Sequence, residues 1–187
     1  LPVYDDMNVS VTQPAGWQVP VDEDNFAQFS YVHKPEGSPE GLKFGGLKPT
    51  GAVPEFVNFP MAKSEATASD DQHCAVAADT QTYDKKEVEY ARKGAPADLM
   101  QRTDYTGCGI MLLGDNVGDD LSLNPDLRSL YKDANGPVRA LPGNHDQDYD
   151  VDSDKDATDT YRAQFGAPYY SYDVGNTHFI ALDNIEY

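Results

Sequence analysis

The sequence is poor in basic residues: 14 Lys and Arg stand against 32 Asp and Glu, which gives a formal net charge of -18. Such an acidic surface repels phosphate backbones and anionic lipid, so charge argues against nucleic acid or an anionic membrane as a partner. The chain also has no apolar run near the roughly 20 residues of a membrane span, and no signal-peptide pattern begins it. We therefore expect no membrane span, and either no leader or one already removed.

Cysteine is scarce too, with Cys74 and Cys108 as the two examples. Both fall in apolar runs that read as strands, where a buried free thiol is the more common state. Two free thiols are therefore the favoured prediction. A disulfide between neighbouring strands is the alternative, and the redox compartment stays open at this level.

The first part of the chain is β-rich and heavy in loops. Residues 7–12 alternate apolar with polar side chains, and residues 29–33 do so less regularly, as half-buried strands would. Proline and glycine clusters at 14–16, 35–39 and 45–46 separate them. The sequence thus predicts a β-rich segment and linker over residues 1–70, followed by a second unit over 71–187.

From about residue 72, short apolar runs alternate with helix-favouring stretches. We expect strands at 74–78, 109–113 and 137–141, and helices at 85–92, 97–102, 121–132 and 158–165 with two closing strands after them. This order predicts an α/β fold with a parallel sheet covered on both faces. Right-handed crossovers would place all three strand ends on one edge of that sheet.

Polar side chains follow each of these strands directly. Asp79 and Gln81 follow the first, Asp115 and Asn116 the second, and Asn144 and His145 the third. Each alone suits a helix N-cap or a turn. Together they supply the oxygen ligands that divalent cations prefer and an imidazole that can ligate or transfer a proton.

Three stretches then carry a resemblance: Ala78-Asp79-Thr80-Gln81, residues 114–120, and Gly143-Asn144-His145-Asp146. In this order they resemble the first three motifs of the calcineurin-like metallophosphoesterases, and in particular a secreted bacterial-type branch with a β-sandwich domain ahead of the catalytic domain. Residues 9–17, 169–173 and 178–183 are similar to flanking stretches of that branch. The resemblance implies the first half of a calcineurin-like β-sandwich flanked by helices, in a secreted or periplasmic protein.

The resemblance also implies a centre of two divalent or trivalent transition metals, iron, manganese or zinc. Asp79 and Gln81 would ligate the first metal, Asp115 would bridge both, and Asn144 would ligate the second. Gln81 stands where most members have a histidine. A metal-bound hydroxide would then attack a phosphomonoester or phosphodiester.

Two further residues take catalytic roles by the same resemblance. His145 would stabilise charge on the phosphate or protonate the leaving oxygen, and a carboxylate would orient it. Asp119 is our candidate for that carboxylate, although related phosphatases place it one residue earlier, where Gly118 stands.

The metal set is incomplete in these motifs alone, because family members draw further histidines from a second half of the domain. His33, His73 and His178 stand in no such motif and are predicted to be structural. We therefore expect the chain to be a fragment, completed by the remaining half in the same polypeptide or in another chain.

An aspartate-rich loop gives a different reading. Its aspartates have the spacing of a helix-loop-helix calcium site, although Ser153 replaces the invariant glycine; they are Asp148, Asp150, Asp152, Asp154, Asp156 and Asp159. Two rival functions thus remain beside the phosphoesterase. One is a non-catalytic fragment or pseudo-enzyme that acts as a binding or structural module, and the other is a calcium-binding extracellular module.

Overall fold

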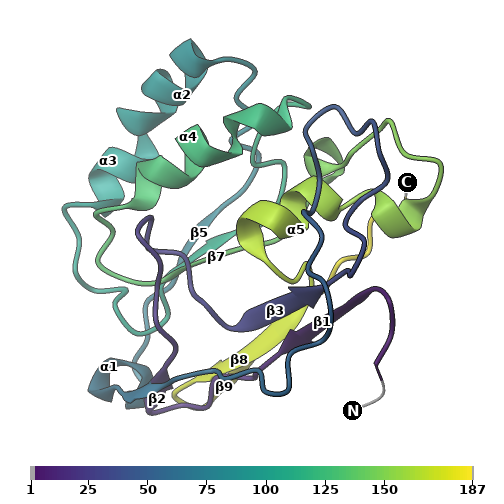
Figure 1. The fold of residues 1–187 in the computed structure, drawn as a ribbon. Helices are drawn as coiled ribbons and strands as arrows, with labels where there is room; N and C mark the ends of the chain where they lie inside the picture. The colour runs from purple at the N-terminus through teal and green to yellow at the C-terminus, as the bar shows by residue number, and fades with distance from the viewer. Residues whose placement is uncertain (1–2, 187) are drawn as a thin grey trace.

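A computed structural model describes residues 3–186 as a mixed α/β fold (Figure 1). The strands are β1 Met7–Ser10, β2 Trp17–Gln18, β3 Ser30–His33, β4 Ala62–Lys63, β5 Ala75–Ala77, β6 Ile110–Leu112, β7 Val138–Ala140, β8 Tyr170–Val174 and β9 Thr177–Ala181. The α-helices are α1 Glu65–Ala68, α2 Lys85–Arg92, α3 Ala95–Leu99, α4 Asn124–Arg128 and α5 Asp159–Phe165. Short 3-10 helices cover Leu121–Leu123, Ser129–Tyr131, Asn144–Asp146 and Asp154–Asp156.

The predicted parallel sheet is confirmed, with strand order β5-β6-β7. Ile110 of β6 pairs with Ala75 on one side and with Val138 on the other, so the three strands are in register and end together. The other strand pairs, β1-β3, β2-β4 and β8-β9, are antiparallel. The carboxyl ends of β5, β6 and β7 therefore share one edge, as expected.

The helices cover one face of the parallel sheet, whereas the opposite face is covered in part, because Val76 of β5 is 59 % exposed there. Alternate side chains such as Ile110 and Val138 pack with Val88 and Leu127 from the helices. On the opposite face Met111 joins a second core built from the β8-β9 hairpin and the N-terminal segment. Figure 1 shows α2, α3 and α4 on one side of β5 and β7, with β8 and β9 on the other.

The predicted helices form close to their expected positions. α2 has the predicted bounds, because Asp84 caps it by accepting a hydrogen bond from the Glu87 amide at 2.9 Å. α3 begins at Ala95, before the expected 97–102, since Pro96 suits the first turn of a helix. The other two expected helices appear as α5 and, at 121–131, as α4 with a 3-10 turn at each end.

The N-terminal segment extends the parallel sheet. Phe26 pairs with Val138 of β7 in a parallel bridge. Val138 donates its amide to the Asn25 carbonyl at 2.9 Å, and the Ala27 amide donates to the Val138 carbonyl at 2.9 Å. Gln13 pairs in the same way with Tyr172 of β8. The N-terminal segment is therefore bonded directly to the sheet that carries the strand-end residues.

The prediction of free thiols is wrong, because Cys74 and Cys108 form a disulfide. The two residues precede the paired strands β5 and β6, and their Cα atoms lie 5.1 Å apart, inside the range that a disulfide requires. Strand register, which the sequence alone did not give, brings them together. With a sequence separation of 34, the bridge is expected to add about 3–4 kcal/mol by restricting the unfolded chain.

No helix within residues 3–186 has the length and apolar character needed to cross a membrane.

Candidate functional site

The loops that follow β5 and β6 run side by side beyond the ends of the strands. The Asp79 amide donates to the Gly114 carbonyl at 3.1 Å, and the Gln81 amide donates to the Asp115 carbonyl at 2.9 Å. These bonds continue the parallel pairing of the two strands through the polar residues. The first two predicted groups of site residues are thus held together by backbone hydrogen bonds.

The Asp115 carboxylate lies between the first and third loops. Its Oδ2 accepts a hydrogen bond from Gln81 Nε2 at 3.1 Å, and its Oδ1 accepts one from the His145 amide at 3.1 Å. The structure therefore brings the polar residues after all three strands to one place. Asp115 thus lies between Gln81 of the first loop and the backbone of the third.

The backbone of this site is unusual. Asp79, Gln81, Asp115 and Asp119 have φ values of 54°, 41°, 50° and 67°. Positive φ is uncommon for residues other than glycine and costs on the order of 1–3 kcal/mol each when it is imposed by the surroundings. Such conformations gather at functional sites, so their presence at four predicted site residues is an independent sign of one.

Two glycines permit the close approach of the second and third loops. A Cβ atom on Gly143 would lie 2.0 Å from Asp115 Oδ1 and 2.2 Å from the Asp115 amide nitrogen. A Cβ atom on Gly114, whose φ is +97°, would lie 2.7 Å from the Gly143 nitrogen. No side chain fits at either position, and the contact sets where Asp115 sits.

Asp146 is a positioning residue to which the sequence motifs gave no role. Its fully buried carboxylate accepts hydrogen bonds from the amides of Gly143 at 2.8 Å and Asn116 at 3.1 Å, and from Asn116 Nδ2 at 3.1 Å. Burial raises the pKa of Asp146 to about 6, although these donors act in the opposite direction. The side chain fastens the loop after β7 to the loop after β6. Its place at the end of the Gly-Asn-His-Asp motif was the signal that could have identified it.

His145 faces Asp119 across the mouth of the site. His145 Nδ1 and Asp119 Oδ1 lie 2.7 Å apart, and the imidazole is 25 % exposed. The structure thus places Asp119 beside His145, while Gly118 packs on the Tyr83 ring. Asn144 is exposed, and its carbonyl accepts a hydrogen bond from the Tyr149 hydroxyl.

The remaining histidines have other neighbours. His33 is buried, stacks on Tyr31 and lies 3.3 Å from the Thr50 hydroxyl. The imidazole of His178 in β9 contacts Asp173, its pairing partner in β8. His73 lies 3.2 Å from Asp104. In each case the imidazole has a local packing or charge partner, as a structural histidine would.

The aspartates of the predicted calcium loop point to different partners. Asp148 is buried and accepts hydrogen bonds from the amide and hydroxyl of Thr160, at 2.8 and 2.7 Å. Asp150 accepts one from the Lys43 amide at 2.6 Å, and Asp159 contacts Lys34. Asp152 and Asp154 are exposed. Asp148, Asp150 and Asp159 therefore point toward donor groups of the protein, as carboxylates in an ordinary folded loop do.

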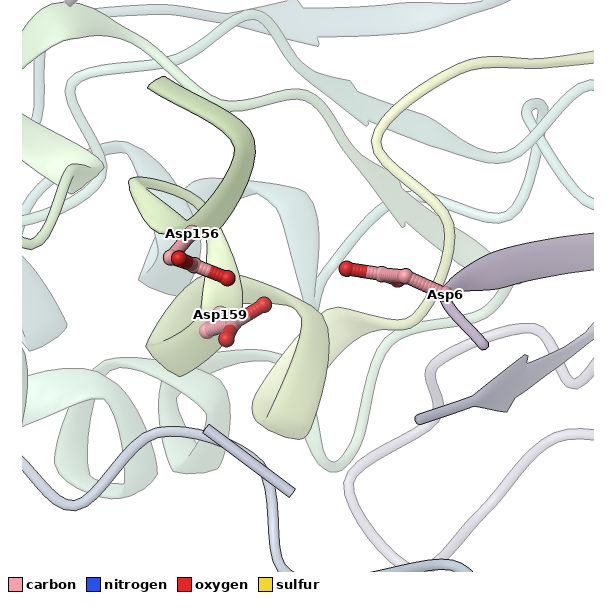
Figure 2. A group of neighbouring side chains, drawn as sticks. All are labelled: Asp6, Asp156 and Asp159. Atoms are coloured by element: carbon pink, nitrogen blue, oxygen red, sulfur yellow. The ribbon is translucent and has the colours of Figure 1, made fainter. Parts of the chain in front are cut away.

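Within residues 3–186, one group of at least three His, Cys, Asp or Glu side chains has ligand atoms within 4.8 Å of one another: Asp6, Asp156 and Asp159 (Figure 2). Lys34 Nζ lies 3.3 Å from Asp6 and also contacts Asp156 and Asp159. Arg162 lies 2.9 Å from Asp159 and also contacts Asp6. Two protein cations already balance most of this charge, so we interpret the group as a buried ion-pair network that joins the N-terminal segment to α5.

This network should make the free energy of unfolding depend on pH. Burial favours a higher pKa for Asp6, but Arg162 and Lys34 outweigh it and lower the pKa below its usual value. A lowered pKa in the folded state stabilises the protein above the unfolded pKa of about 3.9, and the contribution is lost as pH falls through the folded value. We expect Asp6→Asn to destabilise the protein most near pH 6, with a difference from wild type that shrinks toward pH 3.

Urea unfolding at several pH values between 3 and 6 measures that difference. Asp133→Asn, which changes an exposed carboxylate, serves as the matched control and should follow the wild-type curve. A destabilisation by Asp6→Asn that stays constant over the whole range would show that the ionised carboxylate is not its source.

The strand-end residues fit a divalent metal in the kind of ligand they offer. Asp79, Gln81, Asp115 and Asn144 present carboxylate or amide oxygens, and the His145 amide contacts Asp115 while its imidazole contacts Asp119. In the described part of the chain, however, their acidic and histidine side chains do not form a second group of three within 4.8 Å. A complete dinuclear centre would need additional ligands.

No protein-family model matches the sequence, and comparisons with curated proteins and with solved structures likewise find no match.

Proposed function

We propose that the chain carries part of a metal-dependent phosphoesterase site of the calcineurin-like kind, with residues 71–187 as the first half of the catalytic domain. The observation that supports it best is the position of Asp115. Its carboxylate lies between Gln81 and His145, where the loops after three parallel strands meet. Open α/β sheets bind ligands at this edge.

Each residue would have a defined role in binding the metals. Asp79 and Gln81 would hold a first metal, Asn144 would hold a second, and Asp115 would hold both. Bound metals of this type polarise a phosphoryl group and lower the pKa of water so that it can attack near neutral pH. The strained backbone at Asp79, Gln81 and Asp115 supports this role, because it keeps their polar groups at fixed positions on one edge.

His145 would serve as the acid that protonates the leaving oxygen. Its Nδ1 faces Asp119 at 2.7 Å, so the other ring nitrogen is the one left to act on substrate. Asp119 would hold the orientation of the ring. This pair resembles the acid and orienting carboxylate that many hydrolases use.

Two further parts of the proposal concern the surroundings of the site. The Cys74–Cys108 disulfide supports a secreted or periplasmic location, since such bonds persist in oxidising compartments. These residues offer too few ligands for a dinuclear centre, which supports the proposal that further residues, either in the same polypeptide or in another chain, complete the metal site. Iron, manganese and zinc all suit mixed oxygen and nitrogen donors.

The test is an elemental metal analysis of the purified protein, with turnover of an aryl phosphate measured with and without chelator. We expect about two transition-metal ions per site and hydrolysis that chelator abolishes and added manganese or zinc restores. Protein that binds none of the three metals and shows no turnover would overturn the proposal in favour of a binding or structural module. Calcium alone at the stoichiometry of one loop would favour the calcium-binding module.

A further inference from the structure

The Cys74–Cys108 disulfide joins one exposed residue to one buried residue. Cys74 is exposed and comes directly before β5, which lies at the edge of the three-stranded sheet. Cys108 is fully buried in the core beside the β8-β9 hairpin. A thiol opens a disulfide by attacking one of its sulfur atoms, so the product depends on which sulfur the thiol can reach. In this bridge the accessible residue is Cys74, and the sulfur that would leave belongs to Cys108.

A cavity of about 260 Å³ lies against Cys74. Its lining includes the basic side chains of His73 and Arg102 and the larger side chains of Leu99 and Tyr105. Binding sites for drug-sized molecules commonly measure about 300–1,000 Å³. The space beside the disulfide is slightly smaller, so it suits a small organic thiol.

The strand that follows Cys74 has little else to hold it. Val76 is 59 % exposed, and Ala75 and Ala77 are small, half-buried side chains, so β5 buries little apolar surface. Backbone hydrogen bonds attach it to β6: the Ala75 amide donates to the Gly109 carbonyl at 3.0 Å, and the Leu113 amide donates to the Ala77 carbonyl at 2.8 Å. The disulfide is therefore the covalent link at the start of a weakly packed strand.

We propose that Cys74 is a site of covalent modification by low-molecular-weight thiols, and that modification there releases β5 together with the loop that carries Asp79 and Gln81. The thiolate of the small molecule forms a bond to Cys74 Sγ, the bond between the two cysteines breaks, and Cys108 leaves as a thiolate that takes up a proton. The sulfur of the small thiol is oxidised to a mixed disulfide while Cys108 is reduced, so the thiol is the only co-reactant. This chemistry does not depend on the proposed phosphoesterase function.

Peptide mass spectrometry tests the position of the modification. Folded protein is incubated with reduced glutathione, quenched with acid and digested, and the adduct on each cysteine is quantified. We expect glutathione on Cys74 at least about tenfold more often than on Cys108, because the buried sulfur is shielded from attack. The matched control is the same protein unfolded in urea, where both sulfurs are accessible and the preference should fall to within about threefold. Equal modification of the two cysteines in the folded protein, or none of either, would overturn the assignment of Cys74.

Amide hydrogen exchange followed by NMR tests the release of β5. The Asp79 and Gln81 amides donate to carbonyls of the loop after β6. We expect both to exchange at least about tenfold faster in the glutathione-modified protein than in the disulfide-bonded one, because local opening exposes them without global unfolding. The Ile110 amide, which donates to the Pro137 carbonyl on the far side of β6, is the internal control and should change less than about threefold. Unchanged exchange at Asp79 and Gln81, or equal acceleration at all three amides, would overturn the release of β5.

Discussion

Asp115→Asn is expected to lower kcat for a metal-dependent aryl phosphate reaction by about 100- to 1,000-fold, comparable to the loss of a principal electrostatic contributor in other enzymes. A neutral amide cannot serve two cations as a carboxylate does. In addition, Asp115 accepts hydrogen bonds from Gln81 and from the His145 amide. An asparagine would keep one of these acceptors and turn an NH2 group toward the other donor.

Fold stability must be separated from this effect. Asp115→Asn should therefore be compared with wild type by thermal unfolding and by metal content as well as by turnover. Asp133→Asn is the control, because that carboxylate is exposed and belongs to none of the three motifs. Turnover of Asp115→Asn within tenfold of wild type at equal metal content would remove Asp115 from the mechanism.

Gly143→Ala is expected to destabilise the protein by about 3 kcal/mol, at the upper end for overpacking. The reason is a collision, since the added Cβ would lie 2.0 Å from Asp115 Oδ1. The backbone itself is not the obstacle, because Gly143 has a φ of −109°, which any residue can adopt. Movement of Asp115 to relieve the contact should also weaken metal binding.

Chemical denaturation and metal titration measure the two consequences. Gly94→Ala is the control for a methyl group added without a collision, because its Cβ would meet the nearest atom at 3.4 Å. Its backbone, with φ of −93° and ψ of −135°, lies outside the regions that alanine prefers, so that change should cost something but less than Gly143→Ala. A Gly143→Ala protein as stable as Gly94→Ala, with wild-type metal affinity, would contradict the close contact between the two loops.

Much of the sheet could be predicted from the sequence because its signals are local. The apolar runs before Asp79, Asp115 and Asn144 indicated three strands, and the helical stretches between them indicated parallel order. From parallel order alone, the polar ends were expected to meet. The contacts of Asp115 with the neighbouring loops follow from that geometry.

Contacts between distant segments were not accessible in the same way. The disulfide depends on the register of β5 and β6, which neither cysteine reveals by its own surroundings. Asp159 looked like part of a solvated or calcium-binding loop, yet it is buried against Lys34 and Arg162. In an acidic chain, no local pattern shows which carboxylates will find one of the few basic partners.

The pairing of the N-terminal segment with β7 has a consequence for how the chain reaches its native state. Asn25 Nδ2 donates to the Gly136 carbonyl, 111 residues further along, and Thr12 contacts Ser171 across 159 residues. During synthesis the first thirty or so residues therefore cannot form these contacts until the segments that they pair with have been synthesised, much later. Such high contact order favours slow folding. Exposed strand edges in that interval would make the nascent chain a client for chaperones until β7 and β8 have emerged.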